Sequence, residues 1–174
     1  MNTVLYEATS KFDYTILTVP IIIIVALLLF PIVTKNYFEE KYAQQPSERF
    51  DPRFVKQICL VGVVFVSAVT MIVLVVQFSM YHRTVGAYKR GDYQIVEGYV
   101  ENFDPMPYSG HEHETFEIGG IKFSYSNYDH QPGYNNARSH GGVISGNGQH
   151  LKIGYVYLNE TYGNIIVYIE QISD

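Results

Sequence analysis

Residues 58–78 read ICLVGVVFVSAVTMIVLVVQF, a run of 21 residues without a charged side chain. A helix needs about 20 apolar residues to cross a bilayer, so this run predicts a transmembrane helix. Asp51 followed by Pro52 indicates where the helix begins, because an N-cap aspartate and a proline in the first turn both favour helix initiation. We expect the helix to start at Pro52 and to continue through the apolar run.

A second uncharged run covers residues 15–33 (TILTVPIIIIVALLLFPIV) and is long enough for another span. A cleaved signal peptide would have a positively charged start and a small-residue cleavage site, whereas Glu7 and Asp13 precede this run. We therefore expect a retained transmembrane helix, which continues past the apolar run as far as Pro46.

Slightly polar residues recur along the second run. At 100° per residue they fall within an arc of about 80°, which favours a stripe packed against the first span, because hydroxyl and amide groups make interhelical contacts in lipid. A pore-lining face in an oligomer is the alternative, although neither run holds a charged residue that would mark an ion path. The stripe consists of Cys59, Ser67, Thr70 and Gln77.

Basic residues set the expected orientation. Five Lys or Arg residues lie in the loop 34–57, against four outside it in the N-terminal tail and in the linker 79–91 directly after the second run. The positive-inside rule then predicts a multi-pass protein of the cell inner membrane with a cytoplasmic loop and with the C-terminal domain outside. The margin is one residue, so the opposite topology stays open.

The sequence pattern changes after Arg90 from continuous apolar runs to alternation, which is typical of strands. Gly119-Gly120 predicts a two-residue hairpin, and further alternating segments cover residues 151–157 and 165–170. Between them, the long loop 126–150 has room for one more strand around Val143-Ile144. These segments predict a small five- to six-stranded β-barrel or curled sheet.

The predicted fold class is thus membrane α plus all-β, with two transmembrane helices followed by a soluble β-domain. The expected organisation is an N-terminal tail (1–14), transmembrane helix 1 (15–33), a connecting loop (34–57), transmembrane helix 2 (58–78), a juxtamembrane linker (79–91) and the β-domain (92–174).

Several chemistries can be weighed from the residues. A single cysteine excludes a disulfide framework. Ser-His neighbours occur, but no nucleophile-elbow motif does, so we expect neither an enzyme nor a cofactor. Residues 84–174 hold 11 acidic against 5 basic residues, which disfavours direct nucleic-acid binding. Loop histidines are candidate metal ligands, although their spacing matches no ligand signature: His111, His113, His130 and His140.

Four stretches carry a resemblance: VEGYVENF (96–103), MPYSGH (106–111), FSYS (123–126) and SHGG (139–142). Across residues 93–170 the chain resembles an uncharacterised bacterial family of small, OB-like β-barrel modules, some of them membrane-tethered. The resemblance implies a barrel but no activity. In architecture alone, two spans before a compact module are similar to the membrane effectors of bacterial anti-phage systems, such as those of retrons.

Three functions follow as hypotheses. The first is a non-enzymatic membrane effector or regulator in antiviral defence, in which the β-domain senses a trigger and the helices perturb the membrane. The second is a membrane-anchored protein-binding module of the cell envelope, such as an accessory subunit or immunity protein. The third is a metal binder that uses the histidine loops. The expected partners are the lipid bilayer and either a partner protein or further copies of the chain.

Overall fold

The computed structural model describes residues 2–42 and 52–173. The chain divides into two compact units, one formed by residues 12–76 and the other by residues 1–11 together with 77–174. The expected N-cap at Asp51 and the expected helix end at Pro46 lie outside the described residues.

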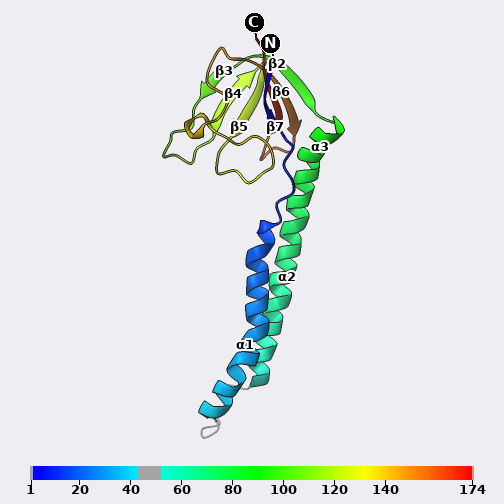
Figure 1. Cartoon of the computed structure of the whole chain (residues 1–174), viewed down its shortest axis with the longest axis vertical. Helices are drawn as coiled ribbons and strands as arrows, with labels where there is room; N and C mark the ends of the chain where they lie inside the picture. Colours follow the sequence, from blue (N-terminus) through cyan, green and yellow to red (C-terminus); the bar gives the residue numbers. More distant parts are fainter. Residues whose placement is uncertain (1, 43–51, 174) are drawn as a thin grey trace. The chain divides into compact units, whose positions relative to one another are not determined.

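The unit of residues 12–76 is helical (Figure 1). A 3-10 turn, η1 (Thr15–Leu17), leads into α1 (Thr18–Tyr42), and α2 (Pro52–Arg83) follows. Both helices are long and apolar enough to cross a membrane, as the sequence predicts. Helix α1 also continues beyond its apolar run, as expected.

The two helices approach each other at Gly62. A Cβ atom at that position would lie 3.2 Å from Cδ1 of Leu27, so the absence of a side chain allows the close approach. Elsewhere the large apolar side chains of both helices face outward, with Val33 73% and Phe65 68% exposed. Almost the whole aliphatic surface of this unit is therefore uncovered by the chain itself.

The described residues of the other unit form seven antiparallel strands in two sheets. The first sheet has the order β1-β7-β6-β2 and the second the order β3-β4-β5. Strand bounds are β1 (Thr3–Glu7), β2 (Gln94–Tyr99), β3 (Glu101–Asp104), β4 (Glu114–Ile118), β5 (Ile121–Tyr125), β6 (His150–Tyr157) and β7 (Asn164–Gln171).

The expected hairpin at Gly119-Gly120 is confirmed. Gly119 and Gly120 both have positive φ, at 56° and 78°, and they connect β4 to β5 with Ile118 opposite Ile121. Gly163, with φ 63°, lies in the turn from β6 to β7. Positive φ at these positions is tolerated because glycine has no Cβ atom.

One continuous segment of the chain contributes a strand to each of the two sheets. Strand β2 pairs with β6, and after Val100 the chain continues as β3, which pairs with β4. Val100 itself is held by Gln149 and Gly148: its N–H donates to the Gln149 carbonyl at 2.9 Å, and its carbonyl accepts from the Gly148 N–H at 2.8 Å. The sheets enclose one core, whose largest fully buried side chains include Phe116, Phe123, Ile153 and Ile169.

The expectation of a five- to six-stranded barrel or curled sheet requires correction: the described residues form seven strands in two sheets, and these do not close into a barrel. Tyr134, from the loop after β5, contacts strands of both sheets. Its N–H donates to the Ile166 carbonyl at 2.9 Å, and its ring packs edge-on against Tyr125 of β5 and Tyr6 of β1, with centroids 5.2 and 5.1 Å away. The loop thus packs against both sheets.

The remainder of that loop contains a short 3-10 helix, η2 (Arg138–His140), and no strand at Val143-Ile144. Ile144 is nevertheless fully buried in the core. The apolar side chain of Ile144 thus indicates burial but not strand pairing, because an irregular segment buries it here.

Strand β1 comes from the segment expected to be an N-terminal tail. It pairs with β7 in a register that sets Thr3 opposite Gln171 and Glu7 opposite Tyr168, and the Ala8 N–H then donates to the Val167 carbonyl at 2.9 Å. Residues at the two ends of the chain therefore share one sheet.

The segment expected to be a juxtamembrane linker is largely helical. It contains the end of α2 and the short helix α3 (Val85–Arg90), which packs with Ala8 and Val167 in a second apolar cluster. Two further contacts hold this helical segment to the N-terminal residues: the Tyr88 hydroxyl bonds Glu7 Oε1 at 2.9 Å, and the Tyr81 hydroxyl bonds the Ser10 carbonyl at 3.1 Å. Strand β7 is consequently buried on both faces.

Candidate functional site on the loops of the β-domain

Three of the predicted histidines each contact an aromatic or acidic side chain from the same loops. The ring of His111 lies 4.0 Å from that of Tyr128, and His140 stacks on Tyr108 at 5.1 Å with 5° between the ring planes. His113 Nε2 lies 3.1 Å from Asp129 Oδ1. His130 is exposed. We call these six residues the loop surface: Tyr108, His111, His113, Tyr128, Asp129 and His140.

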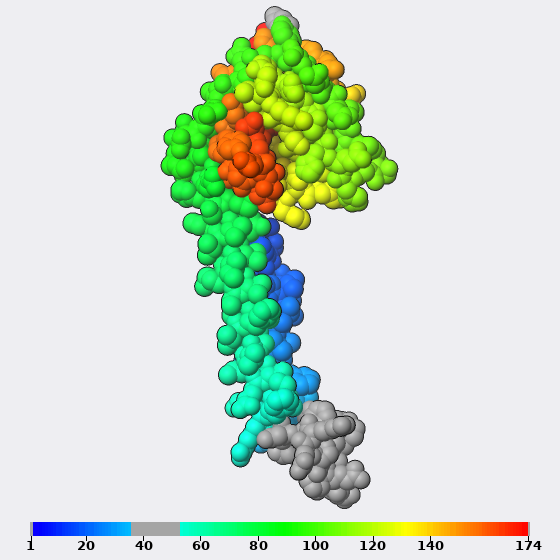
Figure 2. Space-filling view, turned by 180° about the vertical axis from the view of Figure 1, so that it is seen from behind, coloured from blue at the N-terminus to red at the C-terminus, as the bar shows by residue number. Residues whose placement is uncertain are grey.

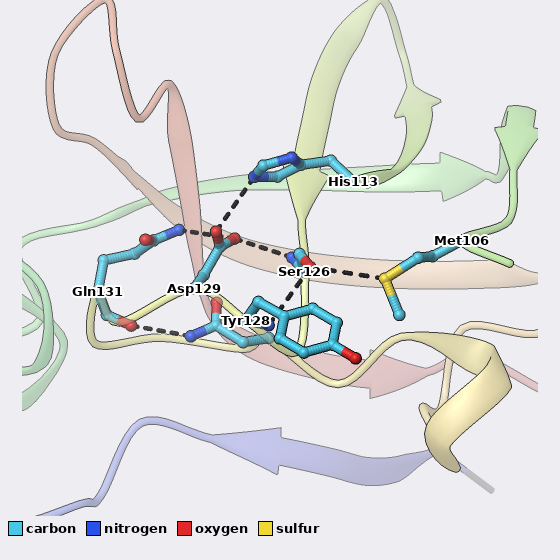
Figure 3. Close-up of polar contacts among 7 residues, drawn as sticks. Met106, His113, Ser126, Tyr128, Asp129 and Gln131 are labelled. Carbon is cyan, nitrogen blue, oxygen red and sulfur yellow. Dashed lines mark hydrogen bonds and ion pairs between the residues drawn. The ribbon is translucent and has the colours of Figure 1, made fainter. Parts of the chain in front are cut away.

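Asp129 accepts hydrogen bonds that hold together the turn of residues 126–131 (Figure 3). Its Oδ2 accepts hydrogen bonds from the Ser126 backbone N–H at 2.8 Å and from Gln131 Nε2 at 3.1 Å, while Oδ1 faces His113. The Ser126 hydroxyl in turn contacts Met106 Sδ at 3.5 Å and accepts from the Tyr128 N–H at 3.3 Å. One carboxylate thereby fixes the turn that carries Tyr128.

A buried carboxylate also holds the loop after β5 through hydrogen bonds. Glu114, at the start of β4, is fully buried; its Oε1 accepts a 2.6 Å hydrogen bond from the Tyr125 hydroxyl. The Arg138 backbone N–H donates to both carboxylate oxygens, at 3.2 and 3.0 Å. Burial, together with the hydrogen bond and the charge of Glu114, raises the pKa of Tyr125 far above its usual value of 10.

Metal and nucleophile chemistry find little support in this arrangement. Among the described residues, no three His, Cys, Asp or Glu side chains are grouped closely enough to hold a metal ion. Ser139 Oγ lies 3.0 Å from His140 Nδ1, but His140 stacks on Tyr108. The Ser126 hydroxyl contacts Met106 and not His113, so these side chains form no serine-histidine-aspartate relay.

The predicted polar stripe of α2 is distributed over different environments. Cys59 is buried and, with Leu27 and Pro31, lines a groove between α1 and α2. The Thr70 hydroxyl donates to the Val66 carbonyl one turn earlier, at 2.7 Å, whereas Ser67 is exposed and Gln77 is half-buried. A continuous packing seam formed by all four residues stays a prediction.

Glu114 and Tyr134 are structurally important residues that were not singled out from the sequence. A signal for Glu114 existed, because it precedes Phe116 and Ile118 at two-residue spacing and therefore shares their inward face in a strand. Tyr134 had no such signal, since it lies in an irregular loop and its neighbours come from both ends of the chain.

Comparisons with known proteins give no match among protein-family models, curated proteins or solved structures. The resemblance to small β-barrel modules and the likeness to anti-phage effectors stay predictions. Function is accordingly inferred from the geometry of the chain alone.

Proposed function

We propose that the chain is a two-span membrane protein whose β-domain is a non-enzymatic module that binds a partner protein through the loop surface. One observation carries the membrane part of this proposal: β1 and β7 pair in the same sheet. Paired strands must lie on the same side of a membrane. The chain between β1 and β7 must then cross the membrane an even number of times. The two apolar helices α1 and α2 provide two crossings, as a helical hairpin does.

The exposed side chains of α1 and α2 support insertion. Large apolar side chains such as Val33, Val61 and Phe65 are each about two-thirds exposed or more. Removing apolar surface from water stabilises by about 25 cal/mol per Å², so a surface of this extent favours lipid over water. Soluble monomers rarely expose contiguous apolar patches larger than a few hundred Å².

The orientation follows from the basic residues. Five Lys or Arg residues between the spans favour a cytoplasmic connecting loop in a cell inner membrane, which sets the N-terminal strand and the β-domain outside. The pairing of β1 with β7 requires only that these two parts lie on one side, so it is compatible with either orientation.

The loop surface has features of a protein contact site. Tyr108 is 76% and Tyr128 47% exposed, and each ring is fixed by a stacked or neighbouring histidine. Tyrosine is favoured at interfaces because a held ring gives contact area at low entropic cost. Residues 84–174 carry six more acidic than basic residues, so the complementary partner surface is basic.

The test is capture of a partner from membranes solubilised in mild detergent. The tagged full-length chain is compared with a Tyr108→Ala/Tyr128→Ala variant and with Tyr162→Ala, which removes an exposed tyrosine from the β6–β7 turn. We expect a stoichiometric partner with the wild type and with Tyr162→Ala, and at least tenfold less with the double variant. Equal recovery by all three, or no stoichiometric partner, would contradict the proposal.

A membrane effector is the second candidate. It is favoured by the outward position of Ser67 and by the large uncovered apolar surface of both helices, which leave room for contacts with further copies in lipid. In this case, removal of the partner causes growth arrest or membrane depolarisation when the full chain is expressed. A chain that is harmless without its partner, under every applied stress, would exclude this candidate.

A further inference from the structure

A surface groove runs where the end of α2, helix α3 and strand β6 meet, and all of its lining lies within one unit of the chain. In Figure 2 the green segment that contains residues 83–94 borders the orange segment that contains residues 155–157. The chemically distinctive lining residues are Arg83, Arg90, Asp92, Tyr93, Tyr155 and Tyr157.

Each arginine makes one polar contact within the chain and keeps further donors available. Arg83 Nη2 donates to the Leu158 carbonyl at 2.6 Å, and Arg90 Nη1 lies 3.5 Å from His82 Nε2. Within the part of the chain that the structure describes, neither guanidinium forms an ion pair with a carboxylate. A guanidinium has five N–H donors, so most of the donors of each arginine are available to a ligand.

The groove lies close in sequence to the predicted end of the second span. Arg83 follows Phe78, the last residue of the apolar run, by five residues in the same helix. At 1.5 Å per residue this is about 7–8 Å, which compares with about 5–7 Å for each polar headgroup layer of a bilayer. Arg83 is therefore at or just beyond the level of the lipid phosphates if α2 spans the membrane, and this step rests on the proposed function.

We propose that this groove binds the phosphodiester of a phospholipid headgroup. Two arginines and one aspartate give the lining a net charge of +1, which matches a phosphodiester with one negative charge better than a phosphate monoester with nearly two. Arginine recognises phosphate oxygens with paired N–H donors. The tyrosine rings at the same groove suit the interface, where amphipathic aromatic side chains favour the headgroup level.

The experiment uses the full chain purified in dodecyl maltoside, a detergent without phosphate, and counts bound lipids by native mass spectrometry. The probes are dioleoylphosphatidylglycerol, dioleoylglycerol as a lipid without phosphate, and glycerol 3-phosphate as a soluble phosphate ester. The variants are Arg83→Gln and Arg90→Gln. Lys122→Gln is the matched control, because it removes one positive charge at an exposed position of β5 outside the groove.

We expect the first phosphatidylglycerol to bind about tenfold more weakly to each arginine variant, the loss typical of one charged hydrogen-bond partner, and equally to the wild type and Lys122→Gln. If Arg83→Gln unfolds because it also loses its hydrogen bond to the Leu158 carbonyl, Arg90→Gln decides the outcome. Within the described residues, the only hydrogen-bond contact of the Arg90 guanidinium is with the His82 side chain.

Three results would overturn this assignment. The first is equal affinity of all variants for phosphatidylglycerol, and the second is binding of dioleoylglycerol as strong as that of the phospholipid. The third is displacement of the lipid by millimolar glycerol 3-phosphate, which would identify a site for soluble phosphate esters. If cysteine labelling shows that the chain forms a membrane hairpin, any of these results overturns the lipid site and leaves the proposed function intact. If labelling shows that the chain forms no hairpin, both the lipid site and the proposed function are overturned.

Discussion

The Tyr125 hydroxyl donates a 2.6 Å hydrogen bond to Glu114 Oε1, and the two side chains are 2% and 0% exposed. The same carboxylate accepts the Arg138 backbone N–H from the long loop after β5. A buried carboxylate with these three donated bonds joins β4, β5 and the loop that carries His140. The loop surface therefore depends on a polar contact inside the core.

Loss of this contact destabilises the β-domain. Tyr125→Phe removes one donor from a buried carboxylate, and we expect a loss of about 1.5–3 kcal/mol in the free energy of unfolding. Glu112→Gln, an exposed change two residues away, is the control and is expected to stay within about 0.5 kcal/mol. Denaturant unfolding of the full chain in detergent measures both. A Tyr125→Phe variant as stable as the control would show that the carboxylate needs no such donor.

Tyrosines packed in the core are expected to set an upper pH limit for the stability of the fold, here called the alkaline limit. Burial, with a smaller contribution from Tyr134, raises the pKa of Tyr6 to about 12, and burial raises that of Tyr134 to about 12 as well. Their pKa in the unfolded chain is about 10, so between pH 10 and 12 the folded state keeps protons that the unfolded state has lost. Stability from these groups is complete below pH 10 and declines as the pH rises through that window.

The Tyr6→Phe variant tests this relation, because it removes one titrating group and no hydrogen bond of the Tyr6 hydroxyl to another described residue is lost. We expect a shallower decline of the unfolding midpoint above pH 10 than in the wild type. Tyr162→Phe, at an exposed turn, is expected to reproduce the wild-type curve. Identical curves for all three proteins would show that Tyr6 does not set the alkaline limit.

Gly133 allows the loop to approach β7. Its φ is +137°, and a Cβ atom there would lie 2.4 Å from Ile165 Cγ2. We expect Gly133→Ala to cost more than about 2 kcal/mol, since it adds a clash to backbone strain. Gly148→Ala, with φ +83° and no atom within 4 Å of its Cβ position, is expected to cost about 1–2 kcal/mol from strain alone. Thermal unfolding ranks the pair, and a reversed order would contradict the described loop packing.

Asp129 is expected to matter more than its histidine partner. His113 has a half-exposed side chain, and exposed ion pairs contribute about 0–1 kcal/mol, so His113→Ala is expected to cost little. Asp129→Ala also removes the acceptor of the Ser126 N–H and of Gln131, and we expect it to cost about 1–3 kcal/mol and to loosen Tyr128. Amide hydrogen exchange at residues 126–131 is expected to be faster in Asp129→Ala than in His113→Ala. Equal exchange in the two variants would contradict the larger role of Asp129.

Much of the fold could be predicted from local patterns. The two apolar helices follow from uninterrupted hydrophobic runs, and the β4–β5 hairpin follows from Gly119-Gly120 between alternating segments. Strand β1 could not be predicted in this way. It is short, and its partner β7 lies more than 150 residues further along the chain.

Sequence patterns could not predict how the two sheets are arranged, for a similar reason. Alternation gives the two faces of each strand, and Phe116 and Ile118 both face the core. Alternation does not say which irregular segment packs against both sheets, and here this is the loop that carries Tyr134, whose neighbours are Tyr6 and Tyr125. Of the loop surface, the histidines were identified from composition, whereas their aromatic and acidic partners depend on the folded loops.

The measurement that tests the account most directly is the sidedness of the two chain ends. In a Cys59→Ser background, single cysteines at Asn2 and at Ser109 are labelled in intact cells with a membrane-impermeant maleimide, with lysed cells as the reference. The account predicts that both positions label in intact cells, because β1 and the β-domain share a sheet outside the cytoplasm. Protection of both would reverse the orientation, and labelling of only one would contradict the two-span hairpin itself.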